Sequence, residues 1–226
     1  MSTRTAVSRE GVLEALRRAP RRPLEAALET TLDHLQASAR SGRGLLADLL
    51  GRAEAFAEWE HYPPRDALDA RSGYRFYYHA HAAQQRARDE HGHFHVFAPR
   101  RAGEAGYVHL FALSVDARGM PLRVFTTNRW VTAEDWQDAA WTLRALRRLD
   151  LSGARPRRVA SWLQGMACLF APQIQAAVLE RDHRIAQRAR QRPLERVLED
   201  RRSHIVSQCP VDLARQFEFL QAAGIA

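Results

Sequence analysis

Apolar residues recur at intervals of three and four over residues 8–60, which is the spacing of amphipathic helices. Clusters containing proline and glycine at 20–23 and 41–44 interrupt this pattern, and both residue types end helices. The sequence therefore predicts three helices in this region, each with one face turned toward a core.

The pattern changes at EHYPP, residues 60–64, where two adjacent prolines exclude helix. Beyond it, four segments are rich in aromatic and β-branched residues or alternate in polarity, as strands do: 74–81, 91–98, 107–115 and 122–127. The turn DARG at 116–119 joins the last two segments as a hairpin. We expect these four segments to form an antiparallel meander.

Helical spacing returns at Thr132, whose hydroxyl is placed to cap a helix beginning at Ala133. Further helices are expected at 159–170, 174–190, 193–204 and 211–221. The predicted class is α+β, with a four-stranded antiparallel sheet packed against N- and C-terminal helices.

We expect one compact unit with two parts. Residues 1–150 would supply the N-terminal helices and the histidine-rich sheet core, and residues 151–226 a C-terminal helical extension. The 174–190 segment is rich in arginine and only thinly apolar. Its helix is therefore expected to project from the core or to meet another copy, giving a homo-oligomer.

Charge and cysteine usage restrict the partners and the compartment. The net charge is +8, but all 34 basic residues are arginine, whereas nucleic-acid binders usually also use lysine, so nucleic acid is disfavoured as a partner. Cys168 and Cys209 are far apart and lack CxxC spacing, which fits a reducing cytoplasm. No apolar stretch is long enough for a membrane span, and a membrane partner is not expected.

Histidine is concentrated in one part of the chain. Seven of the ten histidines lie between positions 61 and 109, at 61, 79, 81, 91, 93, 95 and 109. Side chains two residues apart on a strand share a face. His79 and His81 should therefore lie together, as should His91, His93 and His95.

Pairing the two segments places His81 opposite His91, His79 opposite His93, and Tyr77 opposite His95. Facing Cβ atoms in such pairs are about 4.5 to 5.5 Å apart, so several imidazoles could meet one ion at about 2.0 to 2.1 Å. The predicted metal ligands are His79, His81, His91, His93 and His95. Glu60, Asp66 or Glu90 could add a carboxylate or orient a ligand.

Without nearby cysteine, this set is typical of a transition-metal site in an enzyme that acts on a small molecule or a modified peptide. Iron or copper is favoured over zinc because histidine and carboxylate sets are common in oxidative sites. His93, Tyr77 and His109 are the catalytic candidates, with His61 a further choice. The alternatives are a non-enzymatic protein that binds or senses a metal or haem, and a hydrogen-bonded histidine cluster without a metal.

Residues 125–132, FTTNRWVT, join a strand to a helix, a junction where polar side chains often line a site. Asn128 and Arg129 are candidates for binding a substrate carboxylate or phosphate. Tyr62 is a further candidate for lining the substrate site, although tyrosine on strands more often serves packing.

Two resemblances bear on function. The segment HGHFHVF at 91–97 resembles the motif of histidine-triad nucleotide hydrolases and transferases, which would make His93 a nucleophile, but Gly92 replaces an apolar residue of that motif. The combination of EHYPP, YYHAH, EHGHFHVF and FTTNRWVT resembles an uncharacterised family of bacterial proteins over about residues 58–140. That second resemblance implies no activity.

Overall fold

The computed structural model describes residues 5–51, 56–101 and 106–226. Its helices are α1 (Arg9–Arg18), α2 (Arg21–Ser41), α3 (Leu45–Leu50), α4 (Arg129–Thr132), α5 (Ala139–Leu146), α6 (Arg157–Leu169), α7 (Ala171–Ala189), α8 (Leu194–Leu198) and α9 (Leu213–Ala222), with a short 3-10 turn at Ala83–Gln85. The three helices expected in the first sixty residues are present. The breaks at 20–23 and 41–44 separate them, with Gly42 ending α2 in the left-handed conformation.

Six strands form one antiparallel sheet in the order of the chain: β1 (Tyr62–Leu68), β2 (Arg75–His79), β3 (Gly92–Pro99), β4 (Tyr107–Val115), β5 (Pro121–Thr127) and β6 (Ile205–Pro210). The meander is confirmed, but the prediction of four strands was wrong. The two additional strands are the sheet edges, where pairing on one side only leaves a weak sequence pattern. β1 contains two prolines, which an edge strand tolerates because one side needs no ladder hydrogen bonds.

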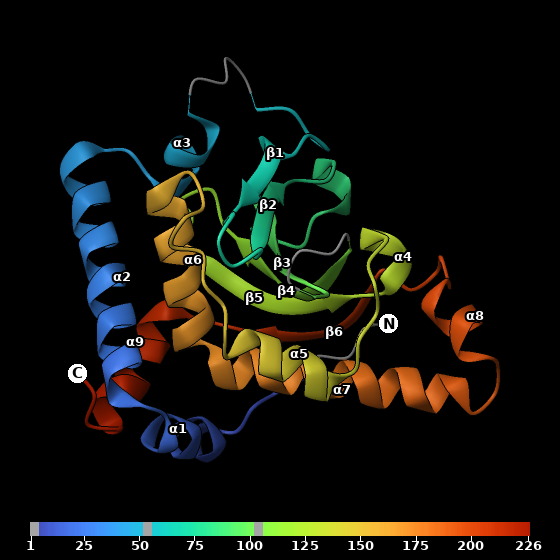
Figure 1. Ribbon diagram of the computed structural model, residues 1–226. Coiled ribbons are helices and arrows are strands. Elements are labelled where there is room, and N and C mark those ends of the chain that lie inside the picture. The colour runs from blue at the N-terminus through green and yellow to red at the C-terminus, as the bar shows by residue number, and fades with distance from the viewer. Residues whose placement is uncertain (1–4, 52–55, 102–105) are drawn as a thin grey trace.

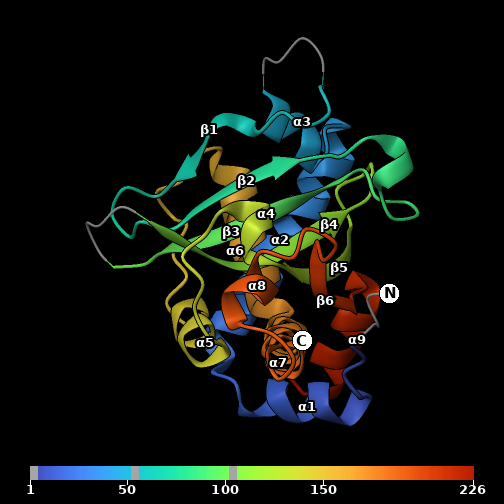
Figure 2. The ribbon, with the colours of Figure 1, turned by 90° about the vertical axis from the view of Figure 1, so that its right-hand side faces the viewer.

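Helices cover one face of this sheet (Figures 1 and 2). Trp162 of α6 packs on Phe94 of β3, with ring centroids 5.7 Å apart. α7 runs beneath β5 and β6, where the carbonyl of Ala177 accepts a hydrogen bond from Ser207. α2 forms an outer layer on α6. The main apolar core lies between these helices and the sheet.

The segment after β5 differs from its prediction. Thr132 does not cap a helix, because it ends the short helix α4 and its hydroxyl oxygen is buried without a hydrogen-bond partner. The following helix, α5, begins seven residues later and is capped by Asp138, whose carboxylate accepts from the backbone N–H of Trp141. The chain between them returns to β4, where the N–H of Asp135 donates to the carbonyl of Tyr107.

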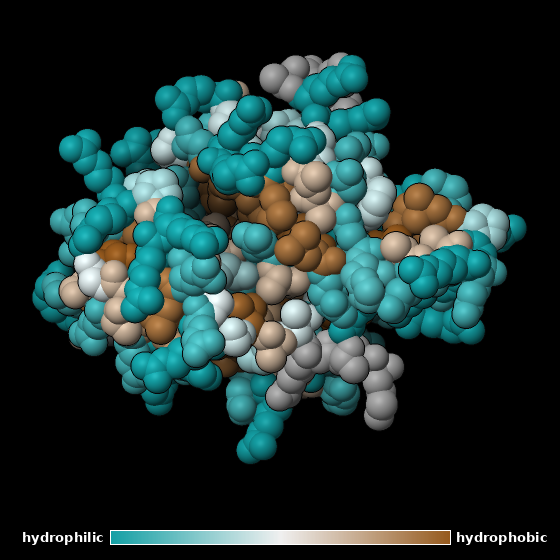
Figure 3. Space-filling model, turned by 90° about the horizontal axis from the view of Figure 1, so that it is seen from below, coloured by the Kyte–Doolittle hydropathy of each residue, from teal (hydrophilic) through white to brown (hydrophobic). Residues whose placement is uncertain are grey.

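Residues 151–226 supply more than helices. β6 pairs with β5 along the sheet edge, and α7 buries Ile174, Ala177 and Val178 in the core. The boundary at residue 150 stays a prediction, since elements on both sides of it share one sheet and one apolar core. The face of the molecule below the helices is largely hydrophilic, with smaller apolar areas between (Figure 3). Within the described ranges, no helix has the length and apolar character needed to span a membrane.

Candidate metal centre

The histidine-bearing strands pair in the predicted register. His79 of β2 lies opposite His93 of β3, and Tyr77 lies opposite His95. Because side chains alternate along a strand, these rings point to the face of the sheet opposite the core residues Tyr78 and Phe94. The face that carries the imidazoles is therefore the one that the main helical layer leaves uncovered.

Three of these histidines form a group able to hold one metal ion. His79, His93 and His95 each offer one ring nitrogen, and these three atoms lie within 4.8 Å of one another. The Nε2 atoms of His79 and His93 are 2.9 Å apart. Two imidazole nitrogens bound to one ion at about 2.0–2.1 Å stand about 2.9–3.4 Å from each other. The group is thus close to coordination geometry.

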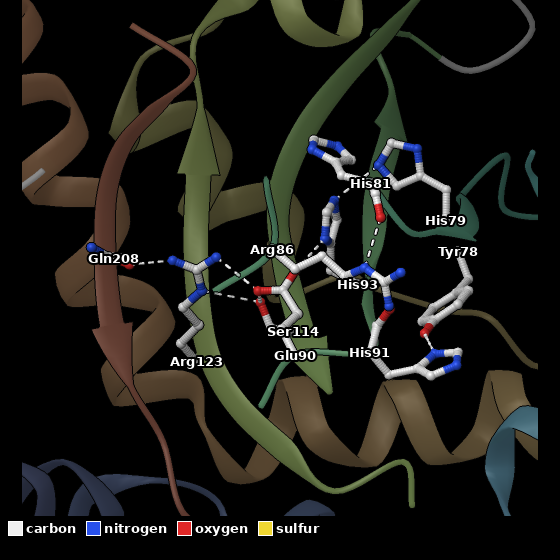
Figure 4. A network of polar contacts seen from close by, with 10 residues as sticks. All are labelled: Tyr78, His79, His81, Arg86, Glu90, His91, His93, Ser114, Arg123 and Gln208. Carbon is white, nitrogen blue, oxygen red and sulfur yellow. Dashed lines mark hydrogen bonds and ion pairs between the residues drawn. The ribbon is translucent and has the colours of Figure 1, made fainter. Parts of the chain in front are cut away.

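A carboxylate network orients His93 (Figure 4). The ring Nδ1 of His93 lies 2.7 Å from one oxygen of Glu90, which leaves Nε2 directed at His79. The other Glu90 oxygen accepts from Ser114 at 3.0 Å and from Arg123 at 2.8 Å. In known metal sites, a carboxylate commonly accepts a hydrogen bond from the second ring nitrogen of a ligating histidine and so fixes its tautomer and orientation.

A second imidazole orients His95. Nδ1 of His95 lies 3.0 Å from Nε2 of the buried His109, whose own Nδ1 lies 3.3 Å from the hydroxyl of Thr127. If Nε2 of His95 binds a metal, its Nδ1 carries the proton and donates to His109. Two of the three candidate ligands therefore have their Nδ1 atoms engaged behind them.

Burial keeps two of the candidate ligands, His79 and His95, neutral. It lowers the pKa of His79 and that of His95 well below the usual value, and neighbouring imidazoles, chiefly His93, lower them further. Burial likewise lowers the pKa of His109 to about 3. Neutral imidazole is the form that binds a metal ion, so at neutral pH no proton has to leave His79 or His95 before binding.

The three imidazoles open into a pocket of about 1050 Å³. His81 lies beside the group, 5.2 Å from His93 between ring centroids, and stacks on the exposed ring of Trp59. His61 stacks on Tyr77 at 3.8 Å, and its Nδ1 lies 3.1 Å from a carboxylate oxygen of Asp66. This volume lies at the upper limit of the usual range of about 300–1,000 Å³ for sites that bind small molecules, and it exceeds the need of a single ion.

His91 lies apart from this group. β3 begins at Gly92, so the two-residue alternation does not extend to His91, whose ring turns toward the helical side. There its Nδ1 lies 2.6 Å from the hydroxyl of Tyr78, and its ring packs against Phe56. Gly92 makes this arrangement possible, because a Cβ atom at that position would stand 2.5 Å from the Tyr78 hydroxyl.

The three substrate-binding candidates also lie outside the pocket lining. The side chain of Asn128 donates to the carbonyl of Val197 and caps α4, while Arg129 is paired with Glu195 and Glu199 on or beside α8. These contacts tie α4 to α8. The hydroxyl of Tyr62 accepts from the backbone N–H of Ala57 instead of facing the pocket.

Sequence reasoning missed several polar residues of the site. Ser114 and Arg123 face each other across β4 and β5, and polar residues inside otherwise apolar strands were the signal available for them. Glu134 had no such signal. It is buried in the pocket wall, it accepts from the backbone N–H of His109, and burial raises its pKa to about 8.

Comparison with known proteins gives membership of a family and no activity. No curated protein and no solved structure matches the chain. A family model does match, over residues 25–211, and this confirms the expected relation to an uncharacterised family. The chain belongs to the family described as Domain of unknown function (DUF6969).

Proposed function

We propose that this protein is a metal-dependent enzyme in which His79, His93 and His95 hold one transition-metal ion. The observation that carries the proposal is the convergence of three imidazoles at the floor of a pocket large enough for a substrate. Three protein ligands leave at least one coordination position for water or substrate, as catalytic metal sites require. A structural site would instead be closed by a fourth ligand.

The residues that would bind the ion restrict the identity of the metal only weakly. Iron and copper were favoured over zinc because a carboxylate was expected to join the histidines. Glu90 has both oxygens engaged by His93, Ser114 and Arg123, and Asp66 is paired with His61 and Arg75. Three neutral imidazoles suit zinc, copper and iron alike, so the reason for preferring an oxidative metal is lost.

The substrate would be a small molecule or a modified peptide segment that enters above the ion. Tyr77 lines the pocket, with its ring centroid 5.0 Å from that of His95, and is placed to contact such a substrate. His109 lies behind His95 and is a positioning residue, because its ring reaches the ion only through His95. His81 and His61 line the same pocket and are candidates for substrate contact.

Metal analysis tests the ligand assignment. The chain would be purified without a histidine tag, stripped with a chelator, and reloaded with zinc, iron(II) or copper(II) in separate samples. Wild-type protein is expected to retain about one equivalent of at least one metal after gel filtration. The variant carrying His93→Ala and His95→Ala is expected to retain less than a tenth of that amount, because one imidazole cannot hold the ion alone.

Two single variants serve as controls. His91→Ala removes a histidine from the same strand segment, and His183→Ala removes an exposed one from α7; both should bind metal as the wild type does. Equal metal content in the double variant and the wild type would contradict the site. Metal binding without turnover across a panel of substrates would favour a binding or sensing protein, and a phosphorylated His93 in metal-free protein would favour the nucleotidyl-transfer alternative.

A further inference from the structure

A second concave site lies on the helical side of the sheet, away from the histidines. It has a volume of about 540 Å³, and its wall includes five arginines, Arg71, Arg100, Arg101, Arg144 and Arg148. We call this the arginine cleft. Ala98 of β3 lines it, whereas its neighbour Phe97 lines the histidine pocket. Because adjacent residues on a strand point to opposite faces, the two sites are separated by the sheet.

Charge in the cleft is strongly unbalanced. Asp150 is the one carboxylate among the described lining residues, and Arg71 already binds it at 2.6 Å. Among the described residues, Arg100, Arg144 and Arg148 have no ion-pair partner. Arg144 lies on α5, and Arg148 lies in the turn that follows it. An anion in the cleft would offset the mutual repulsion of these guanidinium groups.

The walls of the cleft are fixed by buried contacts. The hydroxyl of Tyr74 donates to the carbonyl of Ala145 at 2.8 Å, which ties the residue before β2 to the helix that carries Arg144. The buried carboxylate of Asp69 accepts from the backbone N–H groups of Arg71 and Gly153, which holds the turn bearing Arg71. Three separate parts of the chain therefore place arginines around one space.

We propose that the arginine cleft binds a multiply charged phosphate group of a small soluble molecule. Guanidinium groups bind phosphate oxygens through paired, charge-assisted hydrogen bonds, and several of them favour a dianion or a diphosphate over a single carboxylate. A concave site of this volume fits a small ligand. An extended polyanion such as nucleic acid would instead be bound by a basic stripe along the surface.

Calorimetric titration with inorganic pyrophosphate tests this proposal. The protein is kept metal-free with a chelator that is then removed, so that pyrophosphate cannot bind through an ion at the histidines. Wild-type protein is expected to bind one equivalent. Replacing two exposed arginines by Arg144→Gln and Arg148→Gln should weaken binding by about tenfold or more, since each removes a charge-assisted contact. Arg100→Gln, on another wall, should weaken it in the same direction.

The matched control carries Arg40→Gln and Arg43→Gln, which remove the same charge from exposed positions at the end of α2. This variant should bind pyrophosphate within about twofold of wild type, because screening limits the reach of distant charges. Absence of pyrophosphate binding, or equal loss in both double variants, would overturn the proposal. So would a single-stranded oligonucleotide that binds through Arg144 and Arg148 while pyrophosphate does not.

Discussion

The two faces of the sheet use the same strands for opposite purposes. Toward the helices, β2 and β3 present Phe76, Tyr78, Phe94 and Val96, all fully buried in the apolar core. Toward the pocket, the same two strands present Tyr77, His79, His93 and His95. Adjacent residues on each strand therefore point to opposite faces, one into the apolar core and the next into the pocket.

The difference lies in what burial costs on each face. Apolar side chains gain free energy when they leave water, at about 25 cal/mol per Å². Imidazoles and carboxylates lose it unless each polar atom finds a partner. On the pocket face, the Glu90 carboxylate and the Nδ1 atoms of His93 and His95 are paired with neighbours, and burial still lowers the pKa of His95. A face built only for stability would not contain such groups, so its composition points to binding.

The largest expected effect comes from deleting equal rings on the two faces. Phe94→Ala should lower the free energy of unfolding by about 3–5 kcal/mol, because it leaves a cavity beside Trp162 and Tyr78. Urea denaturation of metal-free protein measures this loss. The metal affinity of the folded variant should stay close to that of wild type, because Phe94 touches no candidate ligand among the ring contacts that the structure describes.

Phe125→Ala is the matched change on the pocket face. Phe125 is buried and contacts the rings of His93 and His95. Its deletion should also destabilise the fold, but in addition it should weaken metal binding, since the two imidazoles lose the ring that packs against them. Equal metal affinities in the two variants would break the distinction between the faces.

The next effect, roughly a few kcal/mol, is expected from the buried acid on the pocket face. Burial raises the pKa of Glu134 to about 8, despite the hydrogen bond from the backbone of His109 and the charges of Arg181 and Arg129, which act in the opposite direction. Between its ordinary pKa of about 4.5 and about 8, the folded state keeps a proton that the unfolded state has lost. Stability therefore falls as the pH rises through this window.

Glu134→Gln removes this titration while keeping an oxygen that can accept from the backbone. Relative to wild type, the variant should become more stable as the pH rises from 4 to about 9, with the change completed near the folded pKa of about 8. Urea denaturation at a series of pH values measures the difference. A difference that is constant with pH would mean that Glu134 ionises normally.

The smallest effect should come from the network behind His93. Glu90→Gln replaces the carboxylate that holds Nδ1 of His93, and loss of such a partner typically costs about 10–100-fold in metal affinity. Competition with a chelator of known affinity measures it. Glu58→Gln is the control, because Glu58 pairs with Arg86 beside the pocket and makes no hydrogen bond to a histidine in the described structure. Equal loss in both variants would mean that charge near the pocket, and not orientation of His93, sets the affinity.

The sequence predicted those parts of the fold that depend on residues close together in the chain. Alternation in 74–81 and 91–98 was enough to place His79 opposite His93. The strand β6 was missed because its partner, β5, lies about eighty residues earlier, and a short segment between helices gives no sign of that pairing. The cap of α5 was misplaced because Thr132 and Asp138 are both good N-caps, and the backbone contact of Asp135 with β4 decides between them.

The same limit applied to the candidate site: the residues on neighbouring strands could be predicted, and the contacts with distant segments could not. The strand period identified His79, His93 and His95, but it also included His91, because the start of β3 at Gly92 could not be located from the sequence. Asn128 and Arg129 were assigned to substrate because their partners on the α8 segment, nearly seventy residues away, could not be foreseen. Glu134 reaches the pocket only through the return of the chain to β4, which has no signature in the sequence.

The central claim is that three imidazoles share one ion, and X-ray absorption at the zinc edge of zinc-loaded, untagged protein tests it most directly. The account predicts three imidazole nitrogens at about 2.0–2.1 Å in wild type and two in the His79→Ala variant, with one or more light ligands completing the shell. A shell with fewer than three imidazoles in wild type, or an unchanged shell in the variant, would contradict it.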